Sequence, residues 1–121
     1  MIYFGKERYC MAKWEQSLSG DFHHFCSYLK RQIIEGSMSA SLEDESYRTI
    51  NDIHIGVLVF ERYSVMGSNR VSLNVTVIGA DGRLDVIAIT SGGSQAILFK
   101  VNTWGEESFL ELFQNYVEEY R

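Results

Sequence analysis

An Asp-Gly pair at positions 81 and 82 stands between two stretches in which apolar residues alternate with polar ones. Asp and Gly tolerate the positive φ angles of a two-residue type I′ turn, so the pair predicts a β-hairpin. The turn fixes a register in which three pairs of compatible residues share one face: Val77 with Val86, Val75 with Ala88, and Leu73 with Thr90. We therefore expect the chain to be built around an antiparallel sheet.

The same period of two recurs before this hairpin. It predicts further strands at residues 13–19, 38–42 and 53–64. The strand at 53–64 is apolar on both faces in its second half, which indicates a central position in the sheet or a covered outer face. Residues 43–52 carry mostly polar side chains, and we predict that they form a connection.

A glycine-rich stretch, TSGGSQA at residues 90–96, suits either a phosphate-binding loop or a second hairpin turn. A phosphate loop needs a helix after the glycines, so that backbone N–H groups and the helix dipole face the anion. The apolar run AILFKV follows instead, without the lysine and hydroxyl spacing of a P-loop. We therefore predict a turn at Gly92 and Gly93 that leads into a sixth strand. The expected pairs are Ala88 with Ile97, Val86 with Phe99, and Asp85 with Lys100.

Two helices are predicted from apolar residues at spacings of three and four. The first ends at Gly36, which suits the left-handed C′ position, and either Ser19 or Asp21 can cap its start. Its apolar face consists of Phe22, Phe25, Cys26, Leu29 and Ile33. The second closes the chain and begins at a capping box of Thr103 and Glu106. Its apolar stripe consists of Phe109, Leu112, Phe113, Tyr116, Val117 and Tyr120.

These elements indicate an α+β fold, with an antiparallel meander sheet of about five to six strands and two helices in the order β-α-β(4–5)-α. The C-terminal helix is expected to pack across one sheet face, because its stripe is too wide for a solvated helix. At 121 residues the chain has room for one domain with a single core, which we place at residues 11–121. Residues 1–10 read either as an N-terminal extension from an alternative start or as an ordinary arm or extra strand.

Charge and composition exclude several functions. Eleven basic and 16 acidic residues give a net charge of −5, with no basic cluster. Because nucleic-acid affinity comes largely from neutralising phosphates, we expect no nucleic-acid partner. No apolar run approaches the roughly 20 residues of a membrane helix, and the N-terminal stretch lacks a secretory signal. Cys10 and Cys26 are too few for a disulfide framework or a four-ligand zinc site, so free thiols in the cytoplasm are expected.

Four stretches resemble a family of short uncharacterised proteins from Gram-positive bacteria: FERYS at 60–64, NRVSLNVT at 69–76, ITSGGSQA at 89–96 and NTWGEESFL at 102–110. The resemblance runs from Met11 to the end of the chain and carries no catalytic motif. It implies a compact bacterial domain of unknown function. The order of elements is also similar to helix-grip and TATA-binding-like folds, in which a curved sheet wraps a C-terminal helix.

The residue types that most often carry chemistry have plainer interpretations here. His23 and His24 are adjacent, so they point about 100° apart on a helix, whereas two metal ligands sit better four residues apart. His54 has no Asp or Cys at ligand spacing. Cys26 lies on an apolar helix face, where burial raises the pKa of a thiol and makes it inert. We predict no catalytic residue, metal or cofactor, and an enzyme stays open only as a dispersed site.

One group of polar residues indicates a binding site at one end of the sheet. Adjacent antiparallel strands reverse direction, so the turn after residue 64 and the turn after residue 91 lie at the same end. The residues expected there are Arg62, Tyr63, Arg70, Ser91, Ser94 and Gln95. Arginines and hydroxyls suit a carboxylate or a phosphate, which arginine binds through paired hydrogen bonds. The plainer interpretation is a surface network of arginine–glutamate pairs that contributes little free energy.

Two functions follow from these patterns. The first is a non-enzymatic binding module that holds a small anionic or apolar ligand between the curved sheet and the C-terminal helix, with the six polar residues at the mouth. The second is a homo-oligomeric interaction domain, because strand 53–63 is apolar on both faces and large exposed apolar patches mark interfaces. The order of elements and the polar cluster favour the binding module.

Overall fold

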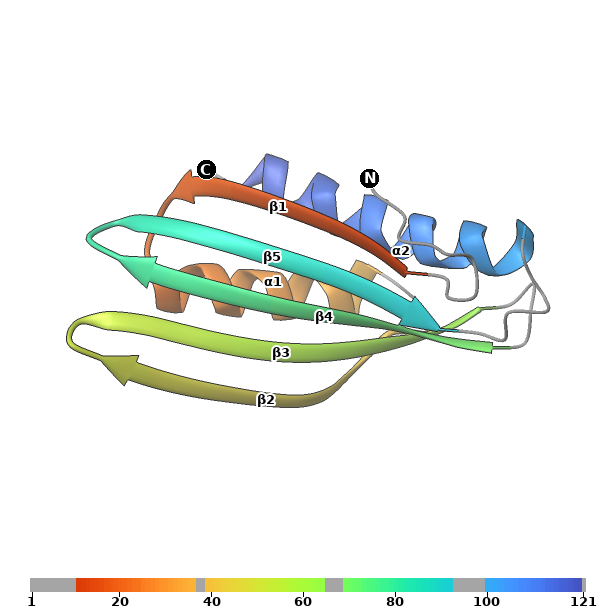
Figure 1. Ribbon diagram of the computed structural model, residues 1–121, viewed down its shortest axis with the longest axis horizontal. Helices are drawn as coiled ribbons and strands as arrows, with labels where there is room; N and C mark the ends of the chain where they lie inside the picture. Colours follow the sequence, from red (N-terminus) through yellow and green to blue (C-terminus); the bar gives the residue numbers. More distant parts are fainter. Residues whose placement is uncertain (1–10, 37–38, 65–68, 93–99, 121) are drawn as a thin grey trace.

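The computed structural model describes residues 11–36, 39–64, 69–92 and 100–120. Over these residues it contains five strands and two helices in the order β1-α1-β2-β3-β4-β5-α2 (Figure 1). Their bounds are β1 (Met11–Ser19), α1 (Phe22–Gly36), β2 (Ser41–Ile50), β3 (Ile53–Ser64), β4 (Asn69–Ala80), β5 (Arg83–Gly92) and α2 (Lys100–Glu119). The strands form one antiparallel sheet in the order β1-β5-β4-β3-β2. The predicted α+β class and order of elements are confirmed, and the predicted extension at 1–10 lies outside the described residues.

The hairpin predicted from the Asp-Gly pair is confirmed. Asp81 and Gly82 have φ angles of 55° and 77°, as a type I′ turn requires. The expected register holds, with all three predicted pairs formed: Val77 with Val86, Val75 with Ala88, and Leu73 with Thr90. A second turn of positive φ, at Asn51 (49°) and Asp52 (71°), joins β2 to β3 and was not predicted.

The prediction that residues 43–52 form a connection is wrong. Strand β2 pairs with β3 from Ser41 to Ile50, with a bulge between Leu42 and Asp44. Residues 43–50 are all exposed. An edge strand is held on one side by backbone hydrogen bonds and does not need an apolar face, so the apolar alternation that marks the inner strands is missing here.

The predicted hairpin at Gly92 and Gly93 is also wrong. The edge of β5 that was assigned to residues 96–101 is occupied by β1. Its pairs are Ala88 with Trp14, Val86 with Gln16, and Asp85 with Ser17. Residues 93–99 lie outside the described part of the chain, and Lys100 begins α2 instead of ending a strand. A glycine is still required at position 92, because a Cβ atom there would lie 2.6 Å from the Arg70 carbonyl oxygen.

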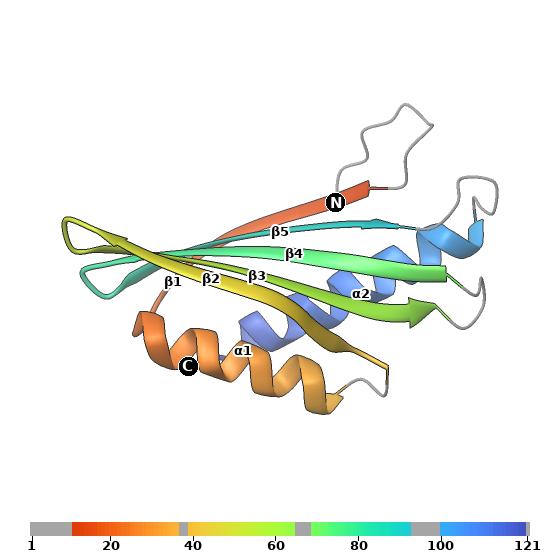
Figure 2. The ribbon, with the colours of Figure 1, turned by 90° about the horizontal axis from the view of Figure 1, so that it is seen from below.

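Both helices lie on the same face of the sheet (Figure 2). Helix α1 begins after Asp21, whose Oδ2 accepts a hydrogen bond from the His24 backbone N–H at 2.9 Å. Helix α2 begins at Lys100, so Thr103 lies inside the helix and the predicted capping box is wrong. The apolar face predicted for α1 is buried, and α2 buries Phe109, Leu110, Phe113 and Val117. The helices and the inner face of the sheet enclose one core.

Candidate functional site

The sheet face that points away from the helices carries a group of β-branched apolar side chains, which we call the open face. Side chains alternate along each strand, so every residue between two buried ones points to this side. On β3, Leu58 and Phe60 are fully buried, while Val57 and Val59 are half-buried. On the three inner strands, the β-branched apolar residues of the open face are Ile53, Ile55, Val57, Val59, Ile78, Ile87 and Ile89. No helix of the described chain covers them (Figure 2).

The strand register makes this group continuous across the three inner strands. Thr76 on β4 pairs with Val57 on one side and with Ile87 on the other. Two residues further along β4, on the same face, Ile78 pairs with Ile55. Directly paired side chains on one face have Cβ atoms about 4.5–5.5 Å apart, so these residues contact one another. The open face therefore presents one apolar patch and not scattered single residues.

Charged side chains border the patch on both edge strands. On β1, Lys13 pairs with Ile89 and Glu15 pairs with Ile87. On β2, Asp44 pairs with Val59, and Arg48 pairs with Ile55. An apolar centre with a charged rim is the usual composition of a protein–protein interface.

The sheet separates the four described residues of the predicted binding site. Arg70 lies on the open face, where its guanidinium contacts Glu61 at 2.6 Å and Glu43 at 3.6 Å. Tyr63 is the cross-strand neighbour of Arg70 and is half exposed. Arg62 points to the helix side and lies 4.7 Å from the centre of the Phe109 ring. The two guanidinium groups therefore face opposite sides of the sheet.

Burial of Arg62 lowers the pKa of its guanidinium, although arginine stays charged at neutral pH.

Of the other predicted residues, Ser91 lies on the open face opposite Ser72, and Ser94 and Gln95 lie outside the described residues. The opposite orientation of the two arginines follows from the register, in which Arg62 pairs with Val71, and Tyr63 pairs with Arg70. Consecutive side chains of a strand point to opposite faces of the sheet, so the sequence alone could have indicated that Arg62 and Tyr63 do not share a face.

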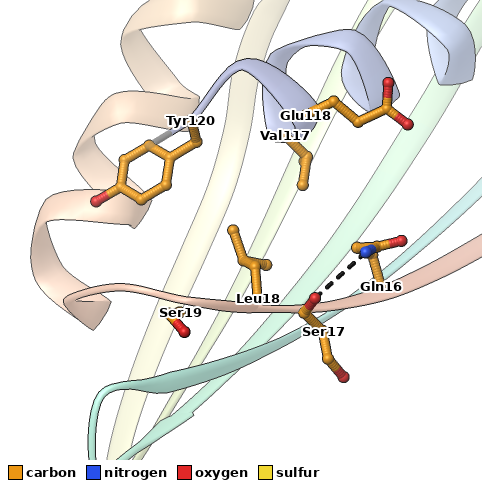
Figure 3. A pocket seen from close by; sticks show the side chains of 7 residues that line it. All are labelled: Gln16, Ser17, Leu18, Ser19, Val117, Glu118 and Tyr120. Carbon is orange, nitrogen blue, oxygen red and sulfur yellow. Dashed lines mark hydrogen bonds between the residues drawn. The ribbon is translucent and has the colours of Figure 1, made fainter.

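A cavity of about 520 Å³ lies between β1 and the end of α2 (Figure 3). Leu18 and Val117 point toward one another across it. Its described lining consists of Gln16, Ser17, Leu18, Ser19, Val117, Glu118 and Tyr120, and none of the four predicted site residues that the structure describes is among them. Sequence reasoning missed this cavity, because it depends on β1 pairing with β5 above α2.

His23 and His54 lie at the end of the sheet that carries the turns at Asp52 and Asp81. The rings of His23 and His54 have centroids 5.1 Å apart, and His54 stacks on Phe22. His24 Nδ1 lies 2.7 Å from the Tyr120 hydroxyl. Among the described residues no group of three or more His, Cys, Asp or Glu side chains could hold a metal ion. No helix within those residues is long and apolar enough to span a membrane.

Cys26 is buried in the core as predicted, and its thiol is free. Burial raises the pKa of the thiol to about 11, with a smaller opposing effect from Lys30. A thiol with this pKa is almost wholly protonated at neutral pH, so Cys26 has the environment of a core residue and not of a nucleophile.

An open antiparallel sheet backed on one side by two helices defines a two-layer α+β domain, and no described helix or strand covers its other face. The chain belongs to a family of unknown function (DUF6054), which matches residues 11–121. No curated protein matches it. It is similar to the hypothetical protein jhp0584 from Helicobacter pylori, with 11% identity and a TM-score of 0.55, covering 92% of this chain and 88% of that chain. At this identity the likeness shows the fold alone. The Gram-positive origin and the helix-grip resemblance stay predictions.

Proposed function

We propose that this domain is an interaction module that associates with itself through the open face. The observation that carries the proposal is the continuous β-branched patch on the sheet face opposite the helices. A sheet usually buries an apolar face against another layer, and two sheets packed face to face are a common solution. The patch lies over β3, β4 and β5, the three inner strands.

The size of the open face supports a stable association. The sheet has five strands. With a spacing of roughly 4.8 Å and about ten residues per strand at about 3.3 Å each, it measures roughly 24 Å by 33 Å, or about 800 Å². A standard protein–protein interface buries about 800 Å² on each partner. One open face is therefore large enough for one partner of similar size.

Molar mass in solution tests this proposal. We expect twice the chain mass of 13.9 kDa in light scattering at tens of micromolar. Ile87→Lys should shift the mass toward a single chain, because it places a charge in the patch. The matched control is Ile34→Lys, since Ile34 is an exposed isoleucine on α1 at 39% exposure. A wild-type mass of one chain, or equal effects of the two variants, contradicts the proposal.

A second candidate function is the binding of a small ligand in the cavity between β1 and α2, supported by its volume. About 520 Å³ lies within the roughly 300–1,000 Å³ typical of small-molecule sites. Glu118 is the charged residue of the described lining, which favours a neutral or cationic apolar compound over the anion expected from the sequence.

Thermal-shift measurements with apolar amines and matched carboxylates test this candidate. Stabilisation by the amines should be lost in Leu18→Trp, which fills the cavity, and retained in the control Ile34→Trp. Failure of both compound classes to stabilise the wild-type protein contradicts ligand binding at this cavity.

A further inference from the structure

We propose that the open face binds a second copy of this chain about a two-fold axis that runs roughly parallel to β4. This inference rests on the self-association proposed above and adds the arrangement of the two copies. Strand β4 is the middle strand of the five. An axis along it, between two facing sheets, places β1 over β2 of the partner subunit and β5 over β3 of the partner subunit. Each row of cross-strand neighbours then faces the same row of the other copy.

The first row decides the electrostatics of this arrangement. It runs across the open face through Lys13, Ile89, Asn74, Val59 and Asp44. The row begins with a cation on one edge strand and ends with an anion on the other. Lys13 therefore faces Asp44 of the partner subunit, and the symmetry forms this contact twice. Neither side chain forms an ion pair with another residue in the described part of the chain.

The apolar side chains also meet apolar side chains. In the first row, Ile89 faces Val59 of the partner subunit. The second row runs through Glu15, Ile87, Thr76, Val57 and Ser46. There Ile87 faces Val57 of the partner subunit, and Thr76 faces its own copy on the axis. Apolar groups thus bury apolar surface, which is the main source of association free energy.

The third row places a cation near an anion of the other copy, although the two are not directly opposed. It runs through Ser17, Asp85, Ile78, Ile55 and Arg48. The Ser17 hydroxyl donates a hydrogen bond to Asp85 Oδ1 at 2.5 Å. The axis along β4 places Arg48 of the partner subunit over Ser17, next to that carboxylate. Asp85 then has a guanidinium close by, although its cross-interface neighbour is Ile55 of the partner subunit.

A two-fold axis across the strands gives a poorer match. It turns the first row onto the third, so that Ile89 faces Asp85 and Asn74 faces Ile78 of the partner subunit. Asp44 then faces Arg48, but two apolar side chains are buried against polar ones and Glu15 faces its own copy, which costs free energy. In the same three rows, the axis along β4 opposes an apolar side chain to a charged one at a single pair, Ile55 with Asp85, and it opposes no like charges. Aligned sheet packing, with strands within about 30° of each other, is compatible with either axis, so the side-chain rows decide between them.

A charge-exchange experiment tests the arrangement. Lys13→Glu and Asp44→Lys each oppose like charges at both symmetric contacts, so each variant alone should associate roughly tenfold more weakly than wild type. A mixture of the two variants restores opposite charges at both contacts. We therefore expect the mixture to form a heterodimer with near wild-type affinity, detected by native mass spectrometry with one variant isotopically labelled. The double variant in one chain should also regain self-association.

The outcomes separate this inference from the proposed function. If wild type is a dimer but the mixture shows no preference for the heterodimer, the axis along β4 is wrong and self-association stands. If wild type is a single chain, self-association itself is overturned, and the open face is left to a different macromolecule. Arg31→Glu, a charge reversal at an exposed position of α1, should leave the affinity unchanged. Circular dichroism of each variant confirms that it is folded.

Discussion

Phe22 is the first residue of α1, and its ring fills space that two glycines leave on the inner face of the sheet. A Cβ atom at Gly79 would lie 2.9 Å from the Phe22 Cβ and 3.0 Å from its Cδ1. A Cβ atom at Gly56 would lie 3.2 Å from the Phe22 Cζ. A side chain at position 79 would therefore force Phe22 to move, and one at position 56 would contact it tightly, so both glycines let the start of α1 approach β3 and β4 closely.

Gly79→Ala should lower the free energy of unfolding by about 1–3 kcal/mol, because the added methyl group overpacks the contact with Phe22. Urea denaturation followed by circular dichroism measures this change. The control is Gly82→Asn, since a Cβ atom at position 82 would have no neighbour within 4 Å and Asn tolerates the φ angle of 77°. That variant should change the free energy by less than about 0.5 kcal/mol. Equal losses in the two variants would show that Phe22 does not need the space at Gly79.

Cys26 links burial to the pH dependence of stability. Burial raises the pKa of its thiol from 9.0 to about 11. Unfolding exposes the thiol and returns its pKa toward 9.0, so between these values the folded protein holds a proton that the unfolded chain releases. The contribution of Cys26 to stability is thus complete below about pH 9 and is lost as the pH rises to about 11.

We expect the free energy of unfolding to fall more steeply between about pH 8 and about pH 11 in the wild-type protein than in Cys26→Ala. The phenol groups of Tyr28, Tyr47 and Tyr120 also have a raised pKa, chiefly through burial, and they contribute the same loss to both proteins. Chemical denaturation at a series of pH values gives the two slopes. Parallel slopes would mean that the thiol ionises as easily in the folded protein as in the unfolded chain.

At the level of whole elements, a hairpin was predictable where its turn is determined locally. Asp81 and Gly82 fix the register of β4 and β5 without help from the rest of the chain. Asn51 and Asp52 form the same kind of turn, and both residue types tolerate positive φ. A search for such pairs would have found the β2–β3 hairpin, even though the exposed residues of β2 show no apolar pattern.

The pairing of β1 with β5 could not be predicted from local pattern. Ala88 is as compatible with Trp14 as with Ile97, so side-chain matching does not choose between a distant strand and a nearby one. The choice depends on which strand can reach the sheet edge once the helices are packed.

The candidate site was predicted in part, since the alternating pattern of β3 showed that its outer face is apolar. The opposite orientation of Arg62 and Arg70 needed the β3–β4 register, which no strong turn signal defines.

The start of α1 gives a prediction at this scale, because the sequence left Ser19 and Asp21 as alternative caps. In the structure Asp21 accepts the hydrogen bond from the His24 backbone N–H. Asp21→Ala should therefore lower the free energy of unfolding by about 1 kcal/mol. Ser19→Ala is the control and should have little effect, since Ser19 belongs to β1 and is exposed. A larger loss in Ser19→Ala would assign the cap to the serine. Thermal or urea denaturation of both variants measures the difference.

The molecule as a whole is asymmetric about its sheet. The chain leaves β1 at one sheet edge, passes through α1 and enters β2 at the opposite edge, and α2 follows β5 on the same side (Figures 1 and 2). Both helices therefore bury one face, and the described chain has no third layer for the other face. Apolar residues on both faces of β3 indicated a covered outer face, but the sequence pattern does not identify what covers it.

A second copy on the open face makes thermal stability depend on protein concentration, because the folded chain binds its partner and the unfolded chain does not. The wild-type Tm should rise by roughly 2–4 °C for each tenfold increase in concentration. Val57→Asp should remove this dependence, since it places a carboxylate in the centre of the patch. Its Tm at the lowest concentration should stay near that of wild type, because Val57 is only half-buried within one chain. Ile34→Asp on α1 should keep the wild-type dependence, and differential scanning calorimetry across a concentration series measures all three proteins. A wild-type Tm that does not change with concentration would mean that no second copy binds the folded chain.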